Sequence, residues 1–142
     1  MKQLKLFLAA LMCLLTSATS FADDTPIPVD QLPVTAKTFV QTSFKNKKII
    51  YAEKDRNSFE CRLDDGTKIE FYKKGMWKKV DCKKGSVPAE IVPSAIQQYV
   101  KGNFPDCFIT KIDKERYGYE IELSNDIDLK FNQKGVLIGM DD

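Results

Sequence analysis

The side chains that most often carry out chemistry are sparse in this sequence. The chain of 142 residues contains no histidine, the usual general base near neutral pH and the base of Ser-His and Cys-His pairs. Neighbouring carboxylates occur at Asp64 and Asp65, and again at Asp126 and Asp128. We interpret these four as turn residues and solvated strand positions. No catalytic residue is predicted, and we expect that the chain is not an enzyme.

The sequence predicts no metal site and no cofactor. The segments DRNSFECRLDDG and SNDIDLKFNQKG lack the spacing of acids, the central glycine and the closing glutamate of an EF-hand loop. Cys61, Cys82 and Cys107 match no zinc-binding pattern. There is also no glycine-rich phosphate loop. We expect Cys61 to be a core residue, whereas the pairing of Cys82 with Cys107 stays open.

The first 22 residues are typical of a signal peptide. Lys2 and Lys5 precede ten apolar residues, 6–15, too few to span a bilayer. Ser20-Phe21-Ala22 then places small residues where signal peptidase cleaves. We expect cleavage near Ala22, a periplasmic or secreted location, and no transmembrane segment in the mature chain. Cys13 leaves lipidation as a weaker alternative, because a bulky methionine precedes it.

The stretch KKGMWKKVDCKK, residues 73–84, contains six lysines and the only tryptophan, Trp77. Taken alone, it suggests a nucleic-acid patch. However, the chain without residues 1–22 has 20 basic and 20 acidic residues, and an exported protein rarely meets nucleic acid. We therefore expect no nucleic-acid partner.

An internal repeat of 60 residues organises the rest of the chain. Residues 27–82 align with 87–142 without a gap, and 13 of the 56 positions are identical. The identities include Pro33/Pro93 and Gly75/Gly135, and the apolar positions keep the same register. Such a repeat indicates two copies of one structural unit. We predict a single domain, 23–142, made of these two repeats.

Each repeat is predicted to contain one helix followed by four short strands. Pro33 and Pro93 suit a first helical turn, and apolar residues follow at helical spacing, with ends near Lys45 and Pro105. The predicted strands are 48–54, 58–63, 67–72 and 76–80, then 108–114, 118–123, 127–132 and 136–140. Short connections require antiparallel meanders, and only the helices can cover their apolar faces. The expected fold class is therefore α+β: two tandem helix-plus-four-stranded antiparallel meander units, with the helices on one face of the sheet or sheets.

These motifs resemble the PepSY-like group of secreted bacterial proteins, also described as β-lactamase-inhibitor-like. The resemblance rests on Pro33, Pro93, FECRLDDGTKIEFYKKGMWKKV (59–80) and YEIELSNDIDLKFNQKGVLIGM (119–140). It implies tandem helix-plus-four-strand units and export, and it supplies no catalytic residues. The second copy departs from the pattern, since Asp126 replaces Gly66 and Leu137 replaces Trp77.

The leading hypothesis is a non-enzymatic exported binding module that contacts another protein through its exposed sheet face. Interfaces favour tyrosine, tryptophan and arginine, and Trp77 is either an anchor on this face or a core residue. The candidate contacts are Glu60, Arg62, Lys68, Glu70, Tyr72, Trp77 and Lys78.

The alternative hypothesis is a binder of an anionic small ligand or of the envelope surface through the basic first repeat. Residues 27–86 contain 14 basic and 8 acidic side chains, a net charge of +6, whereas 87–142 contain 6 and 10, a net charge of −4. Head-to-tail self-association of the two oppositely charged halves is a third possibility.

Overall fold

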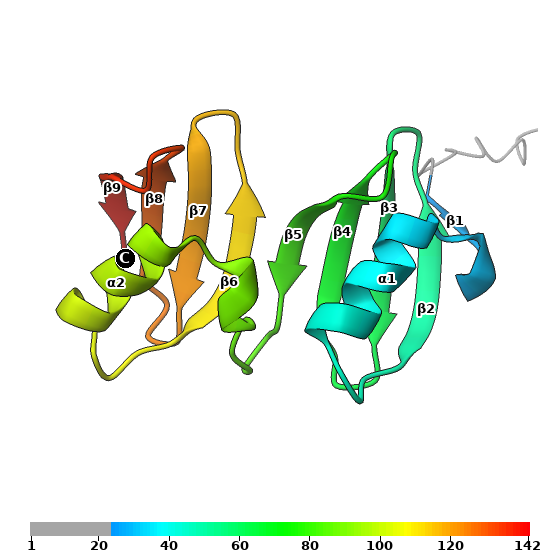
Figure 1. The fold of residues 1–142 in the computed structure, drawn as a ribbon, viewed down its shortest axis with the longest axis horizontal. Helices are drawn as coiled ribbons and strands as arrows, with labels where there is room; N and C mark the ends of the chain where they lie inside the picture. The colour runs from blue at the N-terminus through cyan, green and yellow to red at the C-terminus, as the bar shows by residue number, and fades with distance from the viewer. Residues whose placement is uncertain (1–23) are drawn as a thin grey trace, which may run out of the picture.

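The computed structural model describes residues 24–142, so the predicted signal peptide lies outside the described residues (Figure 1). The first half contains β1 (Thr25–Pro26), a 3-10 helix (Val29–Gln31), α1 (Val34–Ser43), β2 (Ile49–Lys54), β3 (Ser58–Leu63), β4 (Lys68–Tyr72) and β5 (Trp77–Asp81). The second half contains a 3-10 helix (Ala89–Ile91), α2 (Ser94–Asn103), β6 (Ile109–Lys114), β7 (Gly118–Leu123), β8 (Asp128–Asn132) and β9 (Leu137–Asp141). The nine strands form one antiparallel sheet in the order of the sequence. The predicted α+β class is confirmed.

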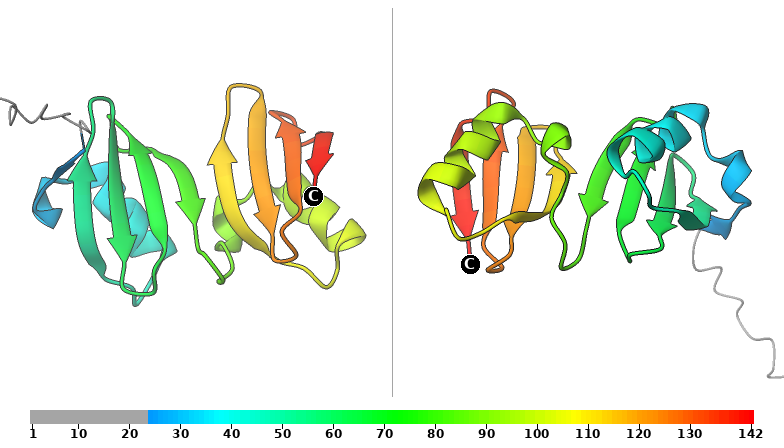
Figure 2. Two further views of the ribbon diagram at one scale, coloured as in Figure 1. Left: turned by 180° about the vertical axis from the view of Figure 1, so that it is seen from behind. Right: turned by 60° about the horizontal axis from the view of Figure 1, so that its bottom comes forward.

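Both helices lie on the same side of this sheet. Figure 1 and the reverse view in Figure 2 show α1 over the strands of the first half and α2 over those of the second. Phe39 of α1 meets Phe71 edge to face at 6.1 Å between ring centroids, and Tyr99 of α2 meets Phe131 in the same way at 5.4 Å. Within residues 24–142, no helix covers the opposite side of the sheet (Figure 1, Figure 2).

The repeated glycines of the last turn are required by close packing against the helix starts. Gly75 and Gly135 have φ values of +94° and +79°, in the left-handed region that favours glycine. A Cβ atom at Gly75 would lie 2.8 Å from Cβ of Pro33, and one at Gly135 would lie 2.6 Å from Cβ of Ala95. The turn between the last two strands of each half thus rests on the beginning of its helix.

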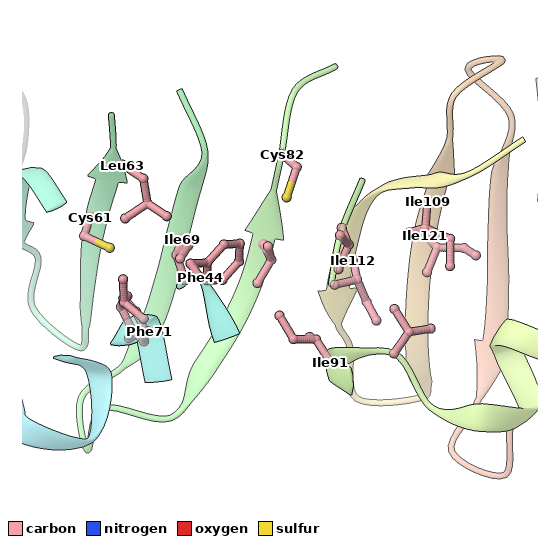
Figure 3. Packing of buried hydrophobic residues seen from close by; sticks show 14 of the residues in the cluster. Phe44, Cys61, Leu63, Ile69, Phe71, Cys82, Ile91, Ile109, Ile112 and Ile121 are labelled. Carbon is pink, nitrogen blue, oxygen red and sulfur yellow. The ribbon is translucent and has the colours of Figure 1, made fainter. Parts of the chain in front are cut away.

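Strands β5 and β6 join the two halves. Lys79 pairs with Asp113, Val80 with Ile112 and Asp81 with Lys111. Val80 and Ile112 are both completely buried. In Figure 3, Ile91 and Ile112 lie where the two halves meet, and the buried side chains of both halves form one hydrophobic cluster.

The three cysteines of the described residues are free thiols. Cys61 is completely buried, which confirms its predicted place in the core. Burial raises the pKa of its thiol to about 12 and that of Cys82 to about 11. Cys82 and Cys107 are not paired in this structure.

Candidate interaction surface

Strand alternation places one set of side chains on the side of the sheet that the helices leave uncovered, which we call the open face. In β3, Cys61 and Leu63 point to the core and are fully buried, so the intervening Glu60 and Arg62 point away from the helices. Register then assigns the residues paired with them in β2 and β4 to the same face. In the first half the open face comprises Tyr51, Glu53, Glu60, Arg62, Lys68, Glu70, Tyr72, Lys79 and Asp81.

A row of three glutamates crosses this face. Glu53, Glu60 and Glu70 lie directly opposite one another on β2, β3 and β4. Like charges in cross-strand positions repel each other and destabilise a sheet. The row continues with Lys79, which lies opposite Glu70, so part of the repulsion is offset at the side nearest the second half.

Glu60 is compensated by two cations. Its Oε1 is buried and receives no aligned hydrogen bond within the described residues, but Nζ of Lys68 lies 3.0 Å away and Nε of Arg62 lies 3.7 Å away. Glu60, Lys68 and Lys78 line a polar hollow of about 290 Å³ together with Glu53 and Glu70. Tyr72 lies opposite Ser58 of β3 and belongs to the same face. All of the seven predicted contact residues except Trp77 therefore share one face.

Tyr51 is an open-face residue that the sequence analysis did not identify. The guanidinium carbon of Arg62 lies 5.1 Å from the centroid of its ring, within the range of a cation–π contact. Its hydroxyl donates a hydrogen bond of 3.0 Å to Glu53 Oε2, which raises the pKa of the Tyr51 hydroxyl. The alternation of β2 could have revealed it, because Tyr51 and Glu53 flank the buried Ala52.

Trp77 does not lie on the open face, which corrects its inclusion among the predicted contacts. Its ring stacks on Phe39 of α1 at 6.2 Å, and it lies opposite the buried Phe71. The physical reason is a β-bulge: Glu70 pairs with Lys79 and Phe71 with Trp77, so Lys78 is an extra residue. The bulge lets Lys78 line the polar hollow while Trp77 packs under the helix.

The second half of the open face is acidic. Its charged residues are Lys111, Asp113, Glu120, Glu122, Asp128, Lys130 and Asp141. Asp113 lies opposite Glu120 and faces Lys79 across the junction, with 3.9 Å between its Oδ2 and Nζ of Lys79. Burial is the main cause that raises the pKa of the Asp113 carboxyl. None of these residues is among the contacts predicted from the sequence, which all lie in the first repeat.

The open face of the first half combines paired charges with an aromatic side chain. The charged side chains come from neighbouring strands, and Arg62 of β3 lies over the ring of Tyr51 of β2. Across residues 24–142, no group of three or more acidic, cysteine or histidine side chains is arranged to hold a metal ion. Neither helix in this part of the chain is long and apolar enough to cross a membrane.

Solved structures of three similar proteins come from Bacteroides species. The first, described as "a putative calcium-regulated periplasmic protein" from Bacteroides thetaiotaomicron, is 43% identical, with a TM-score of 0.81 and coverage of 84% of this chain and 98% of that one. A "putative periplasmic protein" from Bacteroides vulgatus is 40% identical, with a TM-score of 0.80 and coverage of 84% and 98%. A second one from that species, "of unknown function", is 35% identical, with a TM-score of 0.79 and coverage of 84% and 99%.

No curated protein matches the chain. The family described as "Putative beta-lactamase-inhibitor-like, PepSY-like" matches residues 21–69 and 57–139. The two matched segments together extend over nearly all of the described residues, and the solved structures share the same fold at 35–43% identity. The chain therefore belongs to the PepSY-like family.

Proposed function

We propose that this chain is an exported, non-enzymatic binding module that contacts another protein through the open face of its first half. The observation that carries the proposal is the cluster of Tyr51, Arg62, Glu60 and Lys68. Ion pairs and a cation–π contact fix this cluster on a face that neither of the described helices covers (Figure 2). In this proposal residues 1–22 are a cleaved leader, and the domain 23–142 contains two tandem units with both helices on one face. The three similar structures are described as periplasmic proteins, which supports export.

A pre-organised charged surface suits recognition of a folded partner. Side chains already held in one conformation lose less entropy on binding. Charged groups arranged in opposite signs select partners by complementarity and speed association. The open face presents Tyr72, 43% exposed, beside this charged cluster, and aromatic residues next to arginine are the common anchors of protein interfaces.

The name of the Bacteroides thetaiotaomicron protein includes calcium, but we do not extend calcium regulation to this chain. Calcium binds clusters of carboxylate and carbonyl oxygens. The buried carboxylate oxygen Oε1 of Glu60, on the open face, already has the ammonium of Lys68 at 3.0 Å. A calcium ion at this position would have to displace that ammonium.

Photo-crosslinking in the native host tests the proposal. A photoreactive amino acid replaces Tyr72 on the open face, and a matched one replaces Gln41, an exposed residue of α1 on the helix side. The proposal expects one discrete protein adduct at position 72, identified by mass spectrometry, and none at position 41. The variant Arg62→Ala should reduce this adduct at least tenfold, because removal of an interface arginine weakens binding by about 2 kcal/mol. Circular dichroism verifies that the variant is folded without the contacts of Arg62 to Glu60 and Tyr51. Equal adducts at both positions would reject the open face as the binding surface.

An anionic ligand is the second candidate function. A cavity of about 470 Å³ lies at the end of α1, and Lys45 and Lys47 line it with the hydroxyl residues Thr42 and Ser43. Asp65 and Glu90 line the same cavity, which weakens its attraction for anions. This candidate requires binding of vesicles with anionic lipid that falls steeply with salt and that is lost in the double variant Lys45→Ala/Lys47→Ala.

A further inference from the structure

Strand β9 is the counterpart of β5 in the repeat, but it has a different environment. β5 pairs with β4 and β6, whereas β9 pairs with β8 alone among the described residues. The counterpart of the fully buried Val80 is Met140, which is 49% exposed. In the first half, β6 covers the apolar residue at this position, Val80. In the second half no described strand lies beside Met140, so an apolar residue is exposed at the edge of the sheet.

β9 lacks the lysine and proline residues that commonly protect a sheet edge, and its protective features are the bulge at Ile138 and the charge of Asp141. Natural edges carry lysine, proline or very short strands, which prevent pairing with other chains. β1 follows this rule, since it has two residues and one is Pro26. β9 has neither lysine nor proline, and its Ile138 is 55% exposed. In the interior strand β5, Lys78 is the counterpart of Ile138 and Lys79 is the counterpart of Gly139.

Lys130 of β8 extends over β9 towards this edge. Its Cδ lies 3.6 Å from the position that a Cβ atom of Gly139 would occupy, so the absence of a side chain at Gly139 makes room for it. Its Nζ lies 3.6 Å from Oδ2 of Asp141. Gly139 is the counterpart of Lys79, which forms the ion pair with Asp113 across the junction of the two halves. The side chain of Lys130, from β8, thus lies over Gly139 of β9, the position at which β5 has its own lysine, Lys79.

We propose that β9 pairs antiparallel with β9 of a second copy of this chain, about a two-fold axis at Met140. Residues directly opposite in an antiparallel pair share a face of the sheet. Met140 lies opposite the buried Leu129 and belongs to the helix side, whereas Gly139 and Asp141 lie on the open face. The axis at Met140 places the two methionines opposite each other and Gly139 of one copy opposite Asp141 of the other, so both faces match.

This register also brings opposite charges together. Asp141 of each copy faces Gly139 of the other, over which Lys130 extends. Two symmetric contacts between Lys130 and Asp141 therefore form across the axis, as Lys79 and Asp113 do between the halves. The other possible edge, on β2, is occupied by β1, with Pro26 opposite Glu53 and a hydrogen bond of 3.0 Å from Ile27 N–H to the carbonyl of Ala52. The second copy therefore meets β9 and not β2.

Sedimentation velocity over a range of concentrations tests the pairing. A five-residue strand forms a small interface, and interfaces below about 1,200 Å² are typically transient, so a reversible monomer–dimer equilibrium is expected. Met140→Lys should weaken the dimer at least tenfold, because it places two ammonium groups opposite each other. The matched control Ile50→Lys changes an exposed apolar residue, 65% exposed, of β2 and should leave the dimer unchanged. Circular dichroism verifies that both variants are folded.

A disulfide test fixes the register. In a Cys107→Ser background, Met140→Cys should give a covalent dimer on mild oxidation, since directly opposite residues have Cβ atoms about 4.5–5.5 Å apart. Val136→Cys should give little, because the two copies of residue 136 lie four positions on either side of the axis and therefore far apart. A monomer at all concentrations, equal dimerisation of Met140→Lys, or loss of the dimer in Ile50→Lys would overturn the proposal. A Val136→Cys dimer without a Met140→Cys dimer would overturn it as well.

Discussion

The ammonium of Lys114 lies 3.9 Å from the centroid of the Trp77 ring. Trp77 belongs to β5 and Lys114 to β6, so this contact joins the last strand of the first half to the first strand of the second half. Trp77 also stacks on Phe39 of α1. Burial lowers the pKa of Lys114, as expected for an ammonium that has exchanged part of its water for an aromatic ring.

Replacement of these two residues should show how much each part of the contact contributes. Trp77→Ala should lower the free energy of unfolding by about 3 kcal/mol, because it removes a half-buried aromatic side chain from the core. Lys114→Met keeps the aliphatic part and should lower it by about 0.5–1 kcal/mol, the usual contribution of a cation–π pair. Urea denaturation measures both values. A larger loss in Lys114→Met than in Trp77→Ala would contradict this division.

The thiols should differ sharply in reactivity. The thiolate is the reactive form of cysteine, and the pKa values of about 12 for Cys61 and about 11 for Cys82 leave almost none at pH 8. Cys107 is only partly buried. Titration with a thiol reagent of the native protein without residues 1–22, and so without Cys13, should therefore label one residue quickly, and three after denaturation. The variant Cys107→Ser should lose the fast reaction, and fast labelling that persists in it would contradict the burial of the other two.

Two glycines should respond oppositely to the same substitution. Gly118 has a φ of +151°, and a Cβ atom there would lie 2.2 Å from the carbonyl oxygen of Phe131. Gly118→Ala should therefore destabilise the fold by about 2–4 kcal/mol. Gly102 lies in α2 with nothing within 4 Å of its Cβ position, so Gly102→Ala should stabilise by about 0.5–1 kcal/mol. Thermal melting of the two variants under one set of conditions measures the contrast, and shifts of the same sign would contradict it.

Two aspartates should give stability changes of opposite sign with pH. Burial raises the pKa of Asp113 above its ordinary 3.8, so its ionisation opposes folding, and stability is lost as the pH rises from 3.8 through the folded value. Burial also tends to raise the pKa of Asp65. Hydrogen bonds from Thr67, including one of 3.0 Å from the Thr67 N–H, and the charge of Lys47 have the opposite effect. They outweigh burial, so the pKa of Asp65 is lowered. Its stabilisation is present above 3.8 and is lost as the pH falls through the folded value.

At neutral pH, Asp113→Asn should therefore raise the stability and Asp65→Asn should lower it, each by less than about 1 kcal/mol because both groups are partly solvated. Both differences should shrink at pH 3. Denaturation curves at pH 7 and pH 3 give the two pairs of values. A gain in Asp65→Asn at pH 7 would contradict the role of the Thr67 hydrogen bonds.

The gapless repeat located the regular elements, because one pattern of apolar residues appears twice at fixed spacing. The predicted strand 67–72 is observed as Lys68–Tyr72, and the predicted helix end near Lys45 is observed at Ser43. Asp126 has a φ of +68° where Gly66 has +89°, so the two different residues make the same turn, since aspartate tolerates this conformation.

The sequence did not reveal where the pattern shifts by one residue. A bulge adds one residue to a strand without a composition of its own, and the bulge at Lys78 determines that Trp77 faces α1 and not the open face. β1 has only two residues, too few for an alternation to be visible. The contact of Tyr51 with Arg62 depends on the register of two strands, which is fixed by the sheet and not by either strand alone.

The order of the sheet has a consequence for the kinetics of folding. Every described strand pairs only with its neighbours in the sequence. Most of these pairs close short turns, whereas the connections of β1 to β2 and of β5 to β6 each contain a helix. Pairing between sequence neighbours keeps the contact order low, which favours fast folding. The halves meet through three residue pairs, whereas most strand pairs inside a half have four or five. We therefore expect each half to nucleate separately. The free energy of folding should then be the sum of one contribution from each half and one from the junction, as in repeat proteins.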